Sequence, residues 1–240
     1  MNAVQIPDAI AWIERQIRAR EATRYVAVTG MHGVMESSQS AEFRTILEAA
    51  DLVVPDGMPL VWLGRARGYN LRRRVYGPEL MASFCLETGP RYRHFFYGGA
   101  PGVPEHLAEA LHQRTGIQIA GTYSPPFRSL TKEEKADVIA RIEQAAPDVL
   151  WVGLSTPKQE RWMYEFKDDL NVPVMLGVGA AFDLNTGRLK QAPRWMRENG
   201  LEWLFRLLAE PKRLWRRYLI YGSQFLWNVL LETLKIRQFD

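Results

Sequence analysis

Residues 149–178 read VLWVGLSTPKQERWMYEFKDDLNVPVMLGV and hold the clearest strand and helix pattern in the chain. The apolar run Val149–Gly153 comes first, a helical pattern over Pro157–Asp169 follows, and a second apolar run, Val172–Val178, ends the stretch. Continuous apolar strands joined by a helix are typical of parallel strands buried on both faces of a sheet. The stretch therefore predicts a strand–helix–strand unit of an α/β protein.

The same alternation extends toward the N-terminus. Four more strands are predicted, at Tyr25–Thr29, Asp51–Pro55, Arg93–Tyr97 and Ile117–Gly121. Helical spacing occupies four segments: Pro7–Glu21, Ser38–Ala50, Pro104–Arg114 and Thr131–Ala145. The last segment begins with a capping box, in which a threonine is followed three residues later by a glutamate.

After Phe182 only helical patterns remain. We therefore expect a Rossmann-like, mostly parallel sheet flanked by helices over residues 1–190, followed by a helical appendage over residues 191–240. In open parallel sheets, ligands bind beyond the C-terminal ends of the strands. Candidate functional residues should accordingly lie directly after the predicted strands.

Composition places the chain among ordinary globular proteins. It has 240 residues, 47% apolar and 24% charged, with a formal net charge of +4. These values exclude a disordered chain, a collagen and a disulfide-dense miniprotein. Cys85 is the single cysteine, so no intramolecular disulfide can form and a reducing compartment is expected.

The positive charge is concentrated near the C-terminus. Residues 188–240 hold 11 basic and 5 acidic residues, whereas residues 1–187 hold 20 basic and 22 acidic residues. Within Arg206–Tyr221, five basic residues alternate with Leu, Trp and Tyr, which suits an anionic membrane surface. Nucleic-acid binding and simple packing on the core are the alternatives. The apolar stretch Tyr218–Leu231 is too short to span a bilayer.

Polar residues follow the first two predicted strands. Thr29 and His32 follow the first strand, where they supply hydrogen-bonding groups or merely form a turn. Asp56, followed by Gly57, comes after the second strand and suits a general base, although Asp-Gly is also common in turns. Arg74 lies further along and suits a diphosphate, with a solvated charge run as the alternative.

Two further strand ends carry candidate ligand groups. Gly98 and Gly99 belong to a glycine-rich turn before a helix, a pattern that predicts an anion site. The spacing there is neither G-x-G-x-x-G nor a phosphate loop with lysine, which counts against a nicotinamide enzyme. Gln159 and Lys158 open the helix after the fifth strand, and we expect them to point toward the pocket. No zinc spacing and no Asp-x-Asp occur in the sequence, so no metal is expected.

Taken together, these motifs resemble the WecG/TagA/CpsF glycosyltransferases, which form glycosyltransferase family 26. The matching stretches occur in family order over about residues 25–221: ADLVVPDGMPLVW, RRVYGPELM, FFYGGAPGV, GTYSPPF, VLWVGLSTPKQERWM and GVGAAFDLNTGRLKQAPRWMRENGLEWLFRLLAEPKRLWRRYL. The last stretch is long and specific.

The resemblance implies an inverting, metal-independent enzyme that needs no cofactor. It would move a sugar, of the N-acetylmannosamine type or a related hexose, from a UDP-sugar to a polyprenyl-diphosphate-linked sugar. The expected setting is the inner face of a bacterial membrane, to which the enzyme would bind peripherally during synthesis of teichoic acid or exopolysaccharide. Self-association is implied with no fixed number of subunits, and no nucleic-acid partner is expected.

The resemblance also assigns roles to residues. Asp56 matches the proposed base of the family, Arg74 the arginine thought to engage the diphosphate, and Gln159 the glutamine of the PKQE motif. Thr29 matches the threonine after the first strand. Many members have T-x-N there, whereas this chain has Thr29-Gly30-Met31, so the donor sugar is open and His32 is the candidate to replace the missing amide.

The appendage has an implied role as well. In the family this segment is described as targeting the membrane and covering the active site. We expect four arginines to meet lipid headgroups or the acceptor diphosphate: Arg206, Arg213, Arg216 and Arg217. Two other functions stay open from the residues alone, a non-catalytic nucleotide-sugar-binding protein at the membrane and a nucleotide-dependent oxidoreductase.

Overall fold

A single six-stranded sheet lies at the centre of the computed structural model, which describes residues 1–236. The strands lie in the order β2-β1-β6-β5-β3-β4, and every neighbouring pair is parallel. Their bounds are β1 Arg24–Thr29, β2 Leu52–Pro55, β3 Arg93–Gly98, β4 Gln118–Tyr123, β5 Val149–Gly153 and β6 Val174–Gly177. The predicted Rossmann-like α/β fold is confirmed, because all six predicted strands form and pair in parallel.

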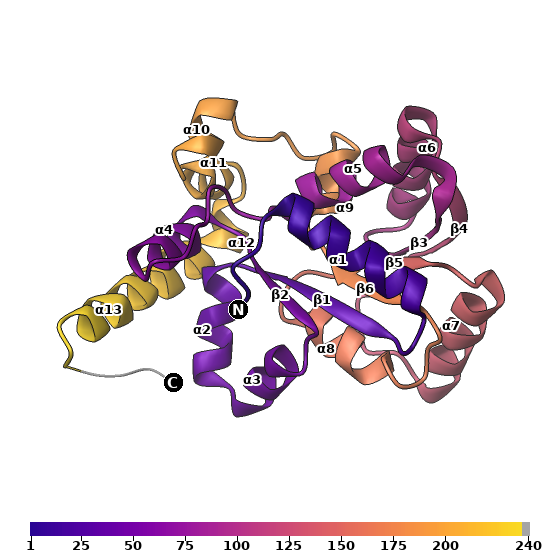
Figure 1. Cartoon of the computed structure of the whole chain (residues 1–240), viewed down its shortest axis with the longest axis horizontal. Coiled ribbons are helices and arrows are strands. Elements are labelled where there is room, and N and C mark those ends of the chain that lie inside the picture. The colour runs from indigo at the N-terminus through magenta and orange to yellow at the C-terminus, as the bar shows by residue number, and fades with distance from the viewer. Residues whose placement is uncertain (237–240) are drawn as a thin grey trace.

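Helices cover both faces of the sheet (Figure 1). One face carries α1 (Ile6–Ala19), α5 (Gly77–Thr88), α6 (Val103–Thr115) and α9 (Ala181–Asn185), whose apolar residues join one core cluster. The other face carries α3 (Ala41–Glu48), α7 (Lys132–Ala145) and α8 (Lys158–Phe166). The central strands therefore have no solvent-facing side, and Trp151 on β5 is completely buried. This is why their sequences are continuously apolar rather than alternating.

One predicted helix is wrong as a single element. The segment Ser38–Ala50 is divided between α2 (Met31–Gln39) and α3, and Ser40 lies between them in an extended conformation. The Ser40 hydroxyl accepts a hydrogen bond from the N–H of Phe43 at 3.2 Å and so caps α3. A serine that caps a new helix cannot also continue the previous one, because the cap residue has non-helical backbone angles.

The periodicity of apolar residues failed to predict two helices. They are α4 (Met58–Ala66) and α5, and each has a proline in its first two positions, Pro59 and Pro78. Proline at this position is a helix-start signal, because its missing N–H would have no partner within the helix. A short 3₁₀ turn, Gly89–Arg91, links α5 to β3. Both missed helices begin near a strand end and so help to shape the site.

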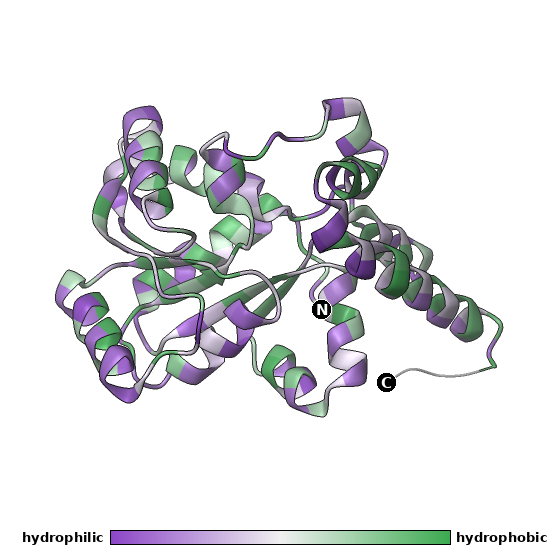
Figure 2. Cartoon of the chain, turned by 180° about the vertical axis from the view of Figure 1, so that it is seen from behind, coloured by the Kyte–Doolittle hydropathy of each residue, from purple (hydrophilic) through white to green (hydrophobic). Residues whose placement is uncertain are grey.

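The chain after α9 forms only helices within the described residues. They are α10 (Arg194–Glu198), α11 (Glu202–Ala209), α12 (Pro211–Trp215), a π-helical turn Arg216–Ile220 and α13 (Tyr221–Thr233). Phe225 of α13 packs with Met35 of α2 and Leu60 of α4 in a small separate core. Figure 2 shows hydrophobic colouring along α11 and α13 as well as in the sheet. Within residues 1–236, no helix is long and apolar enough to cross a membrane.

Candidate active site

Asp56 lies at the C-terminal edge of the sheet, directly after β2. Its backbone N–H donates to the carbonyl of Thr29 at 2.9 Å, which ties the turn to the end of β1. Gly57 has a φ of 120°, a conformation that residues with a side chain rarely adopt, and the chain turns there into α4. The Asp56 side chain is consequently fixed at the edge where parallel sheets bind ligands.

The electrostatic surroundings of Asp56 suit a proton acceptor. Its side chain is 29% exposed, so a substrate can reach it. Burial raises the pKa of Asp56 above its usual range, because a low-dielectric environment disfavours the charged form. Nearby Arg74 lowers that pKa in part, Glu202 raises it, and Arg217 and Arg206 lower it. A reachable carboxylate with a raised pKa is the kind of group that general-base catalysis uses.

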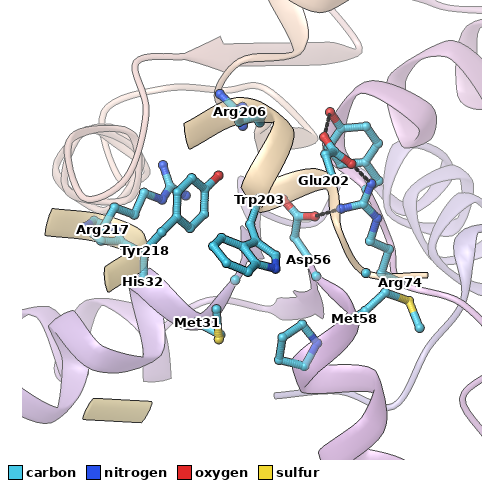
Figure 3. A pocket seen from close by; sticks show the side chains of 15 residues that line it. Met31, His32, Asp56, Met58, Arg74, Glu202, Trp203, Arg206, Arg217 and Tyr218 are labelled. Atoms are coloured by element: carbon cyan, nitrogen blue, oxygen red, sulfur yellow. Dashed lines mark hydrogen bonds and ion pairs between the residues drawn. The ribbon is translucent and has the colours of Figure 1, made fainter. Parts of the chain in front are cut away.

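Arg74 reaches Asp56 from the segment between α4 and α5. The N–H of Val75 donates to the carbonyl of Pro55 at 2.8 Å and holds this segment against the end of β2. An Nη1 atom of Arg74 lies 3.9 Å from an Oδ1 atom of Asp56 (Figure 3). The predicted base and the predicted diphosphate ligand are thus neighbours, although they are 18 positions apart in the chain.

Two adjoining cavities meet at Asp56. The first cavity has about 680 Å³ of empty space and the second about 490 Å³, both counted with the space that is open to solvent. Asp56, Tyr76, Arg206 and Arg217 line both cavities. Two ligands, one in each cavity, would therefore both contact this group of residues.

The walls of the two cavities differ in chemistry. Beside its charged groups, the first cavity is walled by Met31, Met58, Trp203 and Tyr218, which are mainly apolar or aromatic. The second is lined by Ser155, Thr156, Gln159 and Gly179, together with Arg213. The second cavity therefore offers more hydrogen-bonding groups, and the first more apolar surface.

The appendage supplies arginines to both cavities. Arg206 of α11 and Arg217 of the π-helical turn are partly buried, and no ion pair joins either of them to a carboxylate in residues 1–236. Burial lowers the pKa of Arg217, and the neighbouring Arg206 lowers it further. Two cations so close together without paired carboxylates favour a bound anion such as a diphosphate.

The other two predicted arginines lie differently. Arg213 lines the second cavity and is paired with Glu210 on the same helical segment. Arg216 is exposed, lines neither cavity and lies over the ring of Trp215 at 5.7 Å. The four arginines therefore divide into three that reach a cavity and one that faces outward.

Gln159 is buried beneath the second cavity. Its Oε1 accepts from the N–H of Gly179 at 2.9 Å, and its Nε2 donates to Glu160 at 3.0 Å. Thr156 also donates to Glu160, at 2.8 Å. The expectation that Lys158 points into the pocket is wrong, because Lys158 is exposed and lines neither cavity.

Thr29 and His32 occupy different positions at the end of β1. Thr29 is 1% exposed and lines neither cavity, and its buried hydroxyl has no hydrogen-bond partner in the described chain. His32 lines the first cavity, packs edge-on against Tyr221 and lies 3.4 Å from Glu36. Burial lowers the pKa of His32 to about 4, with a contribution from Arg217, so the imidazole is neutral near pH 7.

Gly98 and Gly99 lie outside both cavities, so the structure does not join them to the other site residues. A Cβ atom on Gly98 would lie 2.5 Å from the carbonyl oxygen of Gly153, and one on Gly99 would lie 3.1 Å from Val103. The glycines are explained by close packing of β3 on β5 and on α6. The predicted anion site at this turn therefore has no support in the geometry.

The sequence interpretation missed two residues at the centre of the site. Glu202, the first residue of α11, forms an ion pair with Arg74, and Tyr76 lies against the same guanidinium. Trp203 and Tyr218 complete the appendage side of the first cavity. Glu202 is one of five acidic residues in the mostly basic residues 188–240, and nothing in the local sequence distinguishes it from the other four. In residues 1–236, no three His, Cys, Asp or Glu side chains are grouped as metal ligands.

Comparison with known proteins identifies the kind of enzyme that this site belongs to. A family profile described as "Glycosyl transferase WecG/TagA/CpsF family" matches residues 1–239. A relative from Bacillus spizizenii (strain W23) is 32% identical over 186 residues, which are 77% of this chain and 70% of the relative. A relative from Bacillus subtilis (strain 168) is 28% identical over 180 residues, or 74% and 68% of the two chains. Both are named N-acetylglucosaminyldiphosphoundecaprenol N-acetyl-beta-D-mannosaminyltransferase.

Proposed function

The chain belongs to the WecG/TagA/CpsF family of glycosyltransferases, and from this premise we propose the reaction that it catalyses. It transfers a sugar of the N-acetylmannosamine type, or a related hexose, from a UDP-sugar to a polyprenyl-diphosphate-linked sugar. The names of the two relatives support a mannosaminyl donor group and a diphosphoundecaprenol acceptor. The observation that carries the proposal is the position of Asp56 where two cavities meet, beside Arg74.

In the proposed reaction, the acceptor hydroxyl oxygen attacks the anomeric carbon of the donor sugar. Asp56 takes the hydroxyl proton as the new C–O bond forms. The bond from the anomeric carbon to UDP breaks, and its electron pair stays on the departing diphosphate. A single displacement of this kind inverts the configuration at the anomeric carbon.

The departing diphosphate gains negative charge that must be stabilised. Arg74, Arg206 and Arg217 all lie around Asp56, and Arg213 reaches the second cavity. Fixed guanidinium groups in a partly buried site stabilise such charge without further reorganisation. On this ground we propose that the reaction needs no metal ion.

Transfer assays with a panel of UDP-sugars and a lipid-linked acceptor test the proposal. We expect Asp56→Asn to lower kcat by about 10²- to 10⁴-fold, because the general base is lost. The affinity for the donor should change little. Asp137→Asn is the matched control, since Asp137 is exposed on α7 and pairs with Arg141. Excess EDTA should leave the wild-type rate unchanged.

Two results would contradict this reading. An Asp56→Asn variant as active as wild type would remove Asp56 from the mechanism. A wild-type protein that binds UDP and transfers no sugar from any donor would instead support the non-catalytic alternative. Loss of transfer in EDTA, restored by a divalent ion, would contradict metal independence alone.

We also propose that the appendage binds the anionic surface on the inner face of the cell membrane. Exposed apolar side chains gather there: Leu208, Trp215, Leu219, Leu226, Trp227, Leu230 and Leu234. Basic residues lie among them, including exposed Lys212 and Arg216. Exposed apolar side chains interspersed with cations suit the boundary between lipid headgroups and acyl chains. Such binding would bring the cavities to a lipid-linked acceptor.

A further inference from the structure

Glu202 contacts two residues of the active site from the appendage. It is the first residue of α11 and is 6% exposed. One carboxylate oxygen accepts a hydrogen bond from the hydroxyl of Tyr76 at 2.7 Å, and the other forms an ion pair with an Nη2 atom of Arg74. Both oxygens of this buried carboxylate are thus occupied by residues that come 126 and 128 positions earlier in the chain.

These contacts restrain Arg74 in two directions. Glu202 binds the Nη2 atom of the guanidinium, and the ring of Tyr76 covers the guanidinium face at 4.0 Å. The other terminal nitrogen, Nη1, lies 3.9 Å from Oδ1 of Asp56, which is longer than a direct hydrogen bond. Arg74 therefore lies between two carboxylates but is bound tightly to only one of them (Figure 3).

We infer that Glu202 is a positioning residue of the transfer reaction: by binding Arg74 and Tyr76, it fixes the guanidinium beside Asp56 where the two cavities meet. The inference rests on the proposed function, in which Asp56 is the base and Arg74 meets the diphosphate. If Glu202 did not hold it, Arg74 would be free to close on Asp56 and form a direct ion pair. The base would then be blocked, and the arginine would be turned away from the leaving group.

The charge of Glu202 also acts on Asp56 through space. The charged groups that face Asp56 are Arg74, Glu202, Arg217 and Arg206, with neutral His32 on the cavity wall. Among the charged groups, Glu202 raises the pKa of Asp56 and the three arginines lower it. Removing the Glu202 charge should therefore lower the pKa of Asp56 and make it a weaker base.

The test compares Glu202→Gln with wild type. Glutamine keeps the shape and one acceptor but removes the charge. We expect kcat to fall by about 10- to 100-fold, because Arg74 is no longer held in place. The acidic limb of the kcat/KM profile should move to lower pH, because a base with a lower pKa is deprotonated at lower pH. Glu198→Gln is the matched control, since Glu198 is exposed on α10 and pairs with Arg194.

A second measurement needs no substrate. The ¹³C NMR titration of the Asp56 carboxyl, assigned by its absence in Asp56→Asn, should shift to lower pH in Glu202→Gln and not in Glu198→Gln. An unchanged titration in a folded Glu202→Gln variant overturns the inference. If wild type transfers no sugar, the proposed function fails, and the titration still decides the effect of Glu202 on Asp56.

Two additional variants separate positioning from a general loss of stability. Glu202→Asp keeps the charge and should restore the acidic limb toward its wild-type position. If Glu202→Gln does not fold, Tyr76→Phe takes its place, because it preserves every charge and removes the O–H that orients Glu202. A wild-type kcat in Tyr76→Phe would then overturn the inference.

Discussion

His94 shows how burial defines the chemical state of a single residue. It lies on β3, completely buried, and its Nδ1 accepts a hydrogen bond from the indole N–H of Trp151 at 2.9 Å. The remaining proton of the neutral ring must then be on Nε2, which has no partner among residues 1–236. Protonation would place a second donor opposite the Trp151 N–H. Burial also disfavours the charged ring, and it lowers the pKa of His94 to about 4.

Stability should therefore fall on acidification. The pKa of His94 is lower in the folded chain than in the unfolded chain, so the unfolded state binds more protons between about pH 6.5 and pH 4. This stability is present in full above pH 6.5 and is lost as pH falls toward 4. At pH 5 the loss amounts to about 2 kcal/mol from His94 alone.

Urea unfolding at pH 7.5 and pH 5.0 measures the effect. His94→Asn keeps an acceptor for Trp151 and cannot be protonated in this range, so its free energy of unfolding should depend less on pH than that of wild type. His106→Asn is the control, because His106 is exposed on α6. Equal pH dependence in wild type and His94→Asn would contradict the assignment.

At the scale of elements, the turn between β3 and α6 is constrained by packing. Gly98 has a φ of 128°, and an added Cβ would collide with the backbone of Gly153 on β5. Gly102, four residues later, has a φ of 83° with open space around it. The two glycines therefore separate the cost of backbone strain from the cost of a collision.

Gly98→Ala and Gly102→Ala form a matched pair. We expect Gly102→Ala to lower the free energy of unfolding by about 1 kcal/mol, which is the strain of a left-handed alanine. Gly98→Ala should lower the free energy of unfolding by at least about 2 kcal/mol more than Gly102→Ala does, because strands β3 and β5 must separate. Urea unfolding of both variants measures the difference, and equal losses would show that the close approach does not matter.

Element prediction succeeded where signals are local. The capping box of α7 forms as predicted, with Thr131 accepting from the N–H of Glu134 at 3.2 Å and Glu134 accepting from the N–H of Thr131 at 2.8 Å. The strands were found because burial on both faces makes them continuously apolar. Helices α4 and α5 were missed because the periodicity that marks surface helices is weak in partly or fully buried ones.

At the scale of the whole molecule, α13 is apolar on more than one side. Tyr221, Phe225 and Val229 pack toward α2 and α4, whereas Leu226 and Trp227 are about two-thirds exposed. Packing against α2 and α4 explains why Tyr221, Phe225 and Val229 are apolar, but it does not explain Leu226 and Trp227. The second group is the surface that we propose inserts at the membrane.

Sedimentation with lipid vesicles tests this surface in the full chain. We expect Leu226→Ser with Trp227→Ser to weaken binding to anionic vesicles at least about tenfold, because burying each side chain contributes roughly 1.5–3 kcal/mol. Phe127→Ser is the control, since Phe127 is 83% exposed in the segment between β4 and α7. High salt should weaken binding further, as expected where basic residues meet anionic lipid. If the double variant binds vesicles as well as wild type, this face of α13 is not the membrane-binding surface.

The sequence by itself determined the parallel α/β class, the position of Asp56 after the second strand and the concentration of positive charge in the last residues. Each follows from local order: apolar runs, turn residues and composition. The tertiary structure alone decided the strand order, the exclusion of Gly98 and Gly99 from the cavities and the pairing of Glu202 with Arg74. These depend on which surfaces pack together, because the energy of a charge or of a close contact is set by neighbours in space.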